Sequence, residues 1–546
     1  MNKDHTMTKN SFLSGAFITT LGIVITKIFG IIYVIPFHSI IGESGGALYG
    51  YAYTIYLLFL SLSSAGIPLA ISRVVSEYQT LGYYDTKKRA FILGKKLALL
   101  LGFVCFLILM LFAPVIAKSI LGDLTGGNTI EDIIFVIRVI STAILVVPVL
   151  SIYRGYFEGH RFMGPPSISQ VIEQIVRILI IVLGTFLALN VFKLSLTNAV
   201  GIALLGATIS ACISCLYLII KKRNNNKKFS EKVRQINEPI VSNEQIIKKI
   251  VVYALPFIMI DIFKSLYNYI DMTTVVKGLV ENAKFSIVDA EIIMSMFSTW
   301  ANKFNMIVLS ISSGIVVSLI PNLTLGVVKK NKDSVNKNIC QSLNCLLYFA
   351  IPMTIGISFL SKAIWNLFYG NSLYGSSVLS FYVFSGLVVS LFTLIVSILQ
   401  VFKDYKIIFI SILFGLLFKI MLNTNLISAF YKMGVPAYYG IITATIIGYL
   451  TSICICFFTL NFKHKINFEA VIQNIVDIII GTFLMIIILF IMKLIIPISS
   501  ETRIVNLFII LFYSLCGGIV YIVFSYRCGL LKRIFGNKLK IKKNNG

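Results

Sequence analysis

The stretch LALLLGFVCFLILMLFAPVIA, residues 97–117, contains no charged side chain. A helix needs about 20 mostly apolar residues to cross a bilayer, and lipid offers backbone groups no hydrogen-bond partner outside a helix or a closed barrel. A membrane β-barrel would show short segments of alternating hydrophobicity instead. Long apolar runs recur along the 546 residues, of which only 13% are charged, against about 25% in soluble domains. The sequence therefore predicts an all-α membrane protein.

The apolar runs predict about fourteen transmembrane helices, and the distribution of Lys and Arg tests that number. With fourteen helices, 34 of the 48 Lys and Arg residues fall on one side of the membrane, and only eight fall in the opposite loops. Basic residues favour cytoplasmic loops, so both termini are predicted to be cytoplasmic. The net charge of +26 has the same explanation, and no nucleic-acid partner is expected. The predicted helices span residues 12–37, 47–72, 89–116, 132–157, 166–190, 196–220, 247–276, 289–320, 337–360, 376–402, 405–428, 436–460, 470–496 and 504–526.

A short repeat suggests that the chain has two related lobes. The sequence LSLSS at residues 60–64 resembles LSISS at residues 309–313, and each is followed by a glycine, a proline and a basic turn. Both lie in even-numbered helices, which indicates a parallel repeat, an architecture of transporters with the substrate between the halves. A chance similarity is the alternative. The predicted organisation is an N-terminal lobe at 1–220, a basic cytoplasmic linker at 221–246, a C-terminal lobe at 247–462, and two extra helices with a basic tail at 463–546.

Charged residues within the predicted helices are candidates for function, because they are costly at membrane depth. Lys27 and Lys303 lie well inside their helices, and neither has an acidic residue within four positions. Unpaired cations that line a cavity would suit an anionic substrate such as a phosphate or pyrophosphate. Lys264 and Arg73 are further candidate substrate-binding cations. No catalytic or metal-binding cluster is expected.

Other charges in the helices have structural explanations. Glu173 and Arg177 are four residues apart and can neutralise each other on one helix. Asp261 and Lys264 are three apart and can do the same. Lys419 can extend its long side chain toward the cytoplasmic surface.

Four stretches carry a resemblance to a known family: residues 15–22 (GAFITTLG), 35–37 (IPF), 45–49 (GGALY) and 66–78 (GIPLAISRVVSEY). They resemble the polysaccharide-transporter branch of the multidrug/oligosaccharidyl-lipid/polysaccharide exporter superfamily. Within this branch the chain looks most like the Gram-positive MurJ-type lipid II flippases, with the stage V sporulation protein B relatives close behind. The resemblance implies a V-shaped, two-lobed transporter with two extra C-terminal helices. It would move undecaprenyl-pyrophosphate-linked sugars across the bacterial cell membrane by alternating access.

The resemblance also assigns roles to single residues. The family's cavity arginines in helices one and eight fall at Lys27 and near Lys303, so charge is kept but bidentate geometry is lost. A family arginine in helix two has no counterpart, because residues 50–66 contain no basic residue. Na⁺ as a coupling ion would be held by Asp271, Asn423 and Thr443. One expected acidic ligand is replaced by Ile427, and hard cations prefer oxygen ligands. The alternative is that Asp271 pairs with a cavity lysine.

The leading functional hypothesis is a flippase for lipid II in peptidoglycan biosynthesis, with the lipid-linked oligosaccharide and membrane lipids as partners. Cell-wall synthesis machinery, of vegetative growth or of sporulation, is a further expected partner. The alternatives are a flippase for another lipid-linked polysaccharide, or a multidrug exporter of the same fold, which would want acidic groups facing its cavity. A membrane glycosyltransferase would need clustered external carboxylates, and a non-transporting scaffold would have no use for buried lysines.

Overall fold

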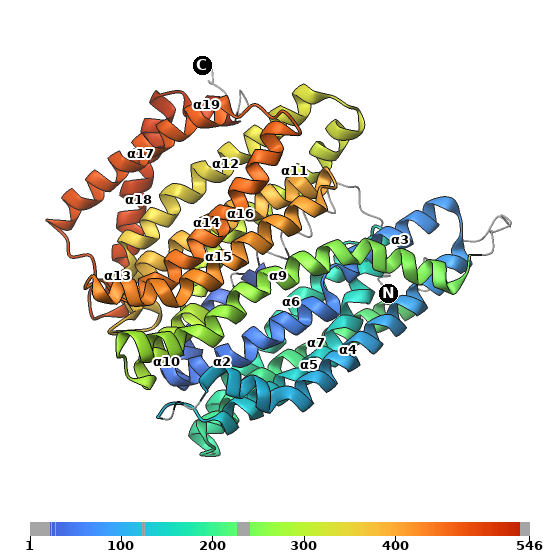
Figure 1. Cartoon of the computed structure of the whole chain (residues 1–546), viewed down its shortest axis with the longest axis horizontal. Helices are drawn as coiled ribbons and strands as arrows, with labels where there is room; N and C mark the ends of the chain where they lie inside the picture. Colours follow the sequence, from blue (N-terminus) through green and yellow to red (C-terminus); the bar gives the residue numbers. More distant parts are fainter. Residues whose placement is uncertain are drawn as a thin grey trace, which may run out of the picture. The chain divides into compact units, whose positions relative to one another are not determined.

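The computed structural model describes residues 22, 25–27, 29–122, 124, 126–225 and 241–535, and helices are the only regular structure among them (Figure 1). The all-α prediction is therefore confirmed. Twelve of the described segments are long and apolar enough to cross a membrane. The remaining two of the fourteen predicted helices are 12–37, half of which lies outside the described residues, and 247–276. Much of the predicted linker and of the basic tail also lies outside the described residues.

The chain forms two compact units, Met1–Thr299 and Trp300–Gly546. In the first unit, α2 contains a kink at Gly42, whose φ of 66° is readily adopted only by glycine. Two short π-helical turns, at Ile180–Gly184 and Leu187–Val191, extend α6. The helices of this unit are α2 (Val34–Ser64), α3 (Ile67–Leu81), α4 (Tyr84–Leu121), α5 (Ile130–Gly159), α6 (Gly164–Leu179), α7 (Leu196–Asn224), α9 (Asn243–Ala283) and α10 (Ile287–Ser295).

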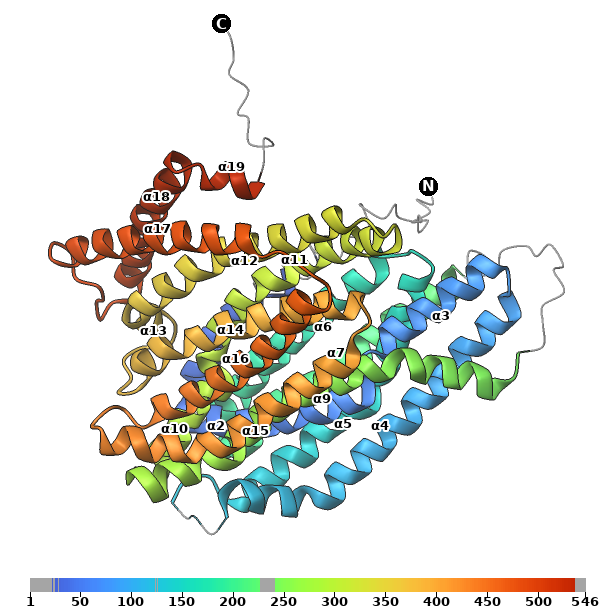
Figure 2. The ribbon, with the colours of Figure 1, turned by 45° about the horizontal axis from the view of Figure 1, so that its top comes forward.

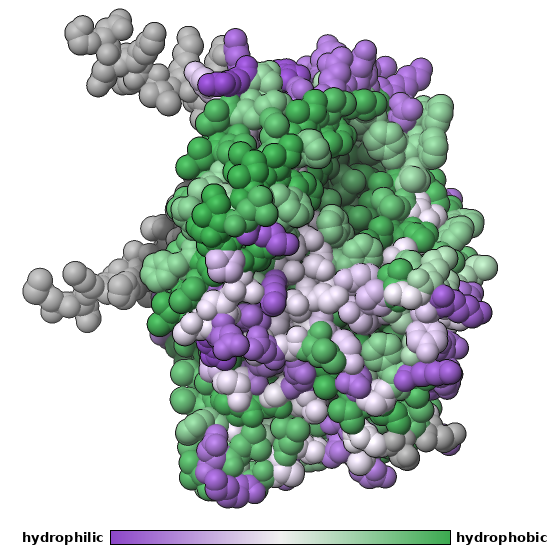
Figure 3. Space-filling view, turned by 90° about the vertical axis from the view of Figure 1, so that its left-hand side faces the viewer, coloured by the Kyte–Doolittle hydropathy of each residue, from purple (hydrophilic) through white to green (hydrophobic). Residues whose placement is uncertain are grey.

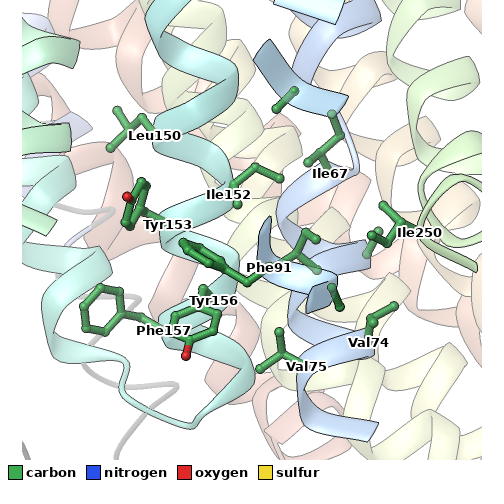
Figure 4. Packing of buried hydrophobic residues seen from close by; sticks show 14 of the residues in the cluster. Ile67, Val74, Val75, Phe91, Leu150, Ile152, Tyr153, Tyr156, Phe157 and Ile250 are labelled. Carbon is green, nitrogen blue, oxygen red and sulfur yellow. The ribbon is translucent and has the colours of Figure 1, made fainter. Parts of the chain in front are cut away.

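The corner between α2 and α3 is built on Gly66 and Pro68. Gly66 has a φ of 71°, and Pro68 lies in the first turn of α3, where a missing backbone N–H costs nothing. Gly155 of α5 packs against this turn so closely that a Cβ would lie 2.4 Å from the carbonyl oxygen of Pro68. Small residues permit such close helix contacts in membranes. Figure 4 shows the resulting core, in which side chains of α3, α4 and α5 meet Ile250 of α9.

In the second unit, α14, α15 and α16 pack on one another, and α17 and α18 form a pair beside α12. Figure 2 shows α15 lying alongside α16. The helices of this unit are α11 (Asn302–Val328), α12 (Lys332–Phe359), α13 (Ser361–Phe368), α14 (Gly375–Val401), α15 (Tyr405–Lys432), α16 (Tyr438–Phe462), α17 (Glu469–Lys493), α18 (Arg503–Arg527) and α19 (Leu530–Phe535).

The two units repeat one pattern of helix pairing. In the first unit, α5 packs against α2, α4 and α7, and α6 packs against α7. In the second unit, α14 packs against α11, α12 and α16, and α15 packs against α16. The order along the chain is the same, so α2, α4, α5, α6 and α7 correspond to α11, α12, α14, α15 and α16. The predicted parallel repeat is confirmed, and α17 and α18 lie outside it.

The packing of α9 differs from the division that the sequence suggested. The predicted C-terminal lobe began at residue 247, after the basic linker. In the structure α9 packs against α2, α3 and α4, and the first compact unit extends to Thr299. Arg73 of α3 lies 4.1 Å above the ring of Tyr253 in α9, and Lys249 of α9 pairs with Glu77 of α3 at 2.6 Å. Such contacts depend on tertiary packing. The basic composition of the linker, which suggested the boundary, gives no information about them.

Asp404 connects the turn between α14 and α15 to the end of α16. Its carboxylate accepts hydrogen bonds from Lys463 and His464, and the His464 ring stacks on Phe402 with 3.9 Å between centroids. Burial raises the pKa of Asp404, but the hydrogen bonds from Lys463 and His464 outweigh burial and hold that pKa below its usual value. The turn is therefore stabilised by the ionised form of the carboxyl group.

This interaction predicts a pH dependence of stability. Because the folded-state pKa of Asp404 lies below the unfolded value of about 3.9, the stabilisation is present above that pH and is lost as the pH falls through the folded-state pKa. Asp404→Asn is expected to lower the unfolding temperature at neutral pH and to flatten its decline in acid. Thermal unfolding in detergent across this range measures the effect, with Glu501→Gln as the exposed control. An unfolding temperature that follows the wild type at every pH would contradict the prediction.

Candidate functional site

Helix α6 presents a polar stripe to the interior of the first unit. Its exposed side chains Ile168, Ile175 and Leu179 recur at a helical period and form one apolar face. The opposite face carries a polar stripe at positions i, i+3, i+4 and i+7. A helix with this pattern turns its apolar face to lipid and its polar face to neighbouring helices. The polar stripe consists of Gln170, Glu173, Gln174 and Arg177.

Glu173 is shared by two arginines. Its Oε2 accepts a hydrogen bond from the guanidinium of Arg154 in α5 at 2.7 Å, and its Oε1 accepts one from Arg177. Arg154 also donates through Nε to the hydroxyl of Ser169 at 2.9 Å. The cluster therefore joins α5 to α6, and its three residues carry a formal charge of +1. Glu158, one turn from Arg154 on α5, is a further carboxylate within electrostatic range of Arg154. The sequence suggested that Glu173 and Arg177 neutralise each other. That interpretation leaves out Arg154, the second cation bound to Glu173.

Three tyrosines on one face of α2 lie near this charge cluster. Tyr49, Tyr53 and Tyr56 all lie within electrostatic range of Arg177. Tyr49 stacks on Tyr53 with 5.5 Å between ring centroids, and Tyr53 contacts Tyr56 at 5.6 Å. The first unit thus combines guanidinium donors with aromatic rings, which are groups that suit phosphates and sugars respectively.

The helical segment that contains Lys27 runs alongside α6. A Cβ at Gly22 would lie 3.1 Å from Ser167, and one at Gly30 would lie 3.5 Å from the amide of Gln174. Lys27 is half-buried between these two contact points. Within the described part of the chain, no carboxylate lies within ion-pairing distance of its ammonium group. The structure thus brings Lys27 to the same helix that carries Arg177.

The other predicted cations of the first unit lie on α3 and α9. Lys264 has Asp261, one turn away on α9, as its electrostatic partner. The adjacent Ser265 contacts Ser61 of α2 at 3.0 Å between hydroxyl oxygens, so this part of α9 faces α2. Arg73 is exposed and stacks on Tyr253 as described above. A direct role of either cation in binding remains a prediction.

The second unit contains Lys303, Asn423 and Thr443. Lys303 is half-buried in the first turn of α11, and Asn423 is buried in α15. The Thr443 hydroxyl donates to the carbonyl of Tyr439 at 2.8 Å. Asp271, the third predicted ion ligand, belongs to α9 in the first unit. The Na⁺ site therefore remains a prediction.

Lys419 does not extend to the surface as the sequence suggested. Its side chain is fully buried, with 0% exposure, and its ammonium donates to the hydroxyl of Thr445 in α16. α15 packs against α16, which supplies the hydroxyl group that accepts this hydrogen bond. A position along the helix cannot show whether a neighbouring helix blocks the route to water.

The second unit also contains an apolar cavity of about 1000 Å³. It lies among α12, α17 and α18, and its ends are lined by residues of α13 and α19. Phe349, Leu360 and Leu489 are among its almost entirely apolar lining side chains. Figure 3 shows a hollowed hydrophobic face on the side of the molecule where α17 and α18 lie. A cavity of this kind suits a hydrocarbon chain.

Sequence reasoning missed Arg154 and the cavity. Arg154 lies near the cytoplasmic end of its predicted helix. The charge distribution therefore places it among the basic residues on the cytoplasmic side of the membrane. The regular spacing of polar residues along α6 is the signal that could have identified the cluster. A neutral pair of Glu173 and Arg177 does not require Gln170 and Gln174 on the same helix face. The cavity leaves no signal in the sequence, because its lining is as apolar as a lipid-facing surface.

Repeated helix pairing in a membrane chain, with cations turned toward the interior, defines a transporter architecture. Solved structures confirm this fold. "Lipid II flippase MurJ, inward closed conformation" matches with a TM-score of 0.64 and 16% identity, over 95% of this chain and 99% of that one. An inward-facing multidrug resistance MATE family transporter of the MOP superfamily matches with a TM-score of 0.61 and 12% identity, over 79% and 93% of the two chains.

The chain belongs to the family of polysaccharide biosynthesis proteins, whose pattern matches residues 12–327. It is 32% identical to the protein called Lipid II flippase MurJ in Bacillus subtilis (strain 168). That similarity covers 97% of this chain and 98% of the relative. The family resemblance expected from residues 15–78 is thereby confirmed, and the protein is a multi-pass membrane protein.

Proposed function

We propose that this protein is a flippase that moves an undecaprenyl-pyrophosphate-linked sugar, lipid II, across the cytoplasmic membrane by alternating access. The observation that carries the proposal is Lys27, a cation within an apolar helix that has no carboxylate partner in the described part of the chain. An unpaired charge at membrane depth is costly and marks a substrate pathway. An anionic head group would neutralise it.

The apolar cavity among α12, α17 and α18 supports a lipid-linked substrate. A small organic cation has no long hydrocarbon chain to place there. The similarity to a lipid II flippase along almost the whole chain supports the same reading. A multidrug exporter of the same fold would instead need unpaired acidic groups, and Glu173 is held by two arginines.

The charge distribution supports an orientation with both termini in the cytoplasm. Cell-wall synthesis enzymes are the proposed partners that supply and consume the substrate. Asp271, Asn423 and Thr443 are the proposed ligands of a coupling Na⁺ ion. No catalytic step is proposed, since translocation changes no covalent bond of the substrate.

Depletion of the protein in its host tests the function. The expected result is accumulation of lipid II in the inner leaflet, measured by lipid extraction and by an enzymatic probe that reaches only the outer leaflet. A drug-susceptibility assay in an exporter-deficient strain tests the exporter alternative. Normal lipid II exposure after depletion, together with drug resistance on overexpression, would replace the flippase proposal with the exporter.

A further inference from the structure

The cluster of Arg154, Glu173 and Arg177 has one cation more than it needs to hold α5 against α6. Arg154 and Glu173 alone would form a neutral link between the two helices. A second arginine adds the cost of an unneutralised charge in a low-dielectric interior. Glu158, one turn from Arg154 on α5, is a second carboxylate within electrostatic range of Arg154, but among the described residues it forms no ion pair with that arginine. The cluster therefore has room for a further anion beside Arg177, which shares Glu173 with Arg154.

The cluster is enclosed by helices but is not sealed. The side chains of Arg154, Glu173 and Arg177 keep 16%, 13% and 18% of their surface exposed, although the lipid-facing side of α6 is the opposite face. The Nε of Arg177 is buried without a hydrogen-bond partner among the described residues. Lys419, a cation on the corresponding helix α15, is by contrast fully buried. The arginine cluster of the first unit is therefore open to a ligand, whereas Lys419 is closed off.

We propose that Arg154 and Arg177 bind a phosphate group of the substrate, and that Glu173 is the resident anion with which this phosphate competes. This rests on the proposed function and names the pyrophosphate site within the first unit. Guanidinium groups bind phosphate oxygens in a bidentate manner, which Lys27 cannot do. Tyr53, which is partly exposed and stacks on the buried Tyr49, lies near Arg177 and is the aromatic ring available to the attached sugar.

The test measures binding of undecaprenyl pyrophosphate to the full chain in nanodiscs of zwitterionic lipid. Arg177→Gln is expected to weaken binding about tenfold or more, because charge-assisted hydrogen bonds contribute roughly 1.5–3 kcal/mol. Arg177→Lys is expected to fall between this variant and the wild type. Glu173→Gln keeps the shape and raises the net charge of the cluster to +2, so it is expected to tighten binding. Arg138→Gln, an exposed arginine of α5, is the matched control.

The outcomes separate this proposal from the proposed function. No binding of the probe by the wild type would refute the flippase proposal itself. Wild-type binding that is unchanged in both Arg154→Gln and Arg177→Gln would overturn only the phosphate site. Loss of binding in Glu173→Gln, in step with a lower unfolding temperature, would show a structural role and also overturn it. A second measurement in phosphatidylglycerol nanodiscs distinguishes the ligand source, because competition that depends on Arg177 would assign the site to membrane phosphates instead.

Discussion

Transport of a long polyprenyl substrate is expected to fall sharply when Gly356 and Gly518 are both replaced by tryptophan. Gly356 of α12 and Gly518 of α18 line the apolar cavity, and a Cβ at either position meets no heavy atom within 4 Å. The new side chains would therefore enter the cavity without displacing a helix. Overfilling a packed site costs about 1–3 kcal/mol, which corresponds to a roughly ten- to hundredfold slower flipping rate if the polyprenyl chain must occupy the cavity.

Flipping in proteoliposomes measures this effect, with an undecaprenyl substrate compared against a short-chain analogue. The analogue is expected to be moved at nearly the wild-type rate, since it does not reach into the cavity. Gly314→Trp is the control, because this glycine of α11 also has open space around its Cβ but does not line the cavity. Wild-type rates for the long substrate in a folded double variant would show that the cavity does not hold the chain.

Replacing Lys27 with methionine is expected to change stability and binding in opposite directions. Removal of an unpaired cation from the membrane relieves a cost of about 2.5–3.5 kcal/mol on insertion scales, so the unfolding temperature is expected to rise. Binding of lipid II is expected to weaken by roughly ten- to hundredfold, because a charge-assisted hydrogen bond to the pyrophosphate is lost. Such a combination is typical of a residue that is kept for function at the expense of stability.

Lys27→Arg is the control for this prediction, since it keeps the charge and adds bidentate geometry. It is expected to bind lipid II at least as well as the wild type. Binding in nanodiscs and thermal unfolding in the same lipid provide both measurements. If Lys27→Met binds lipid II as tightly as the wild type, Lys27 is not part of the binding site. The double variant Lys27→Ala with Lys303→Ala extends the test to the second predicted cation.

The spans and the repeat could be predicted because hydropathy is a local property. A run as long and apolar as residues 97–117 is not expected in a soluble protein. The sequences LSLSS and LSISS lie in equivalent helices of the two units. Lys27 could be identified for the same reason, since a charge within an apolar run is visible without knowing its neighbours. Prediction from the sequence fails where the role of a residue depends on a neighbouring helix. The sequence alone could not show that Lys419 is fully buried and bonded to Thr445 of α16, or that α9 packs with the first unit.

The sequence by itself determined that the chain is a helical membrane protein with a parallel repeat, a family resemblance and a cation at position 27. Only the tertiary structure decided that Arg154 reaches Glu173, which converts a neutral pair into a cluster of net positive charge. It also decided that α12, α17 and α18 leave an apolar cavity between them. The physical reason is that burial in lipid depends on composition, whereas contacts between helices depend on their rotation and crossing, which composition leaves open.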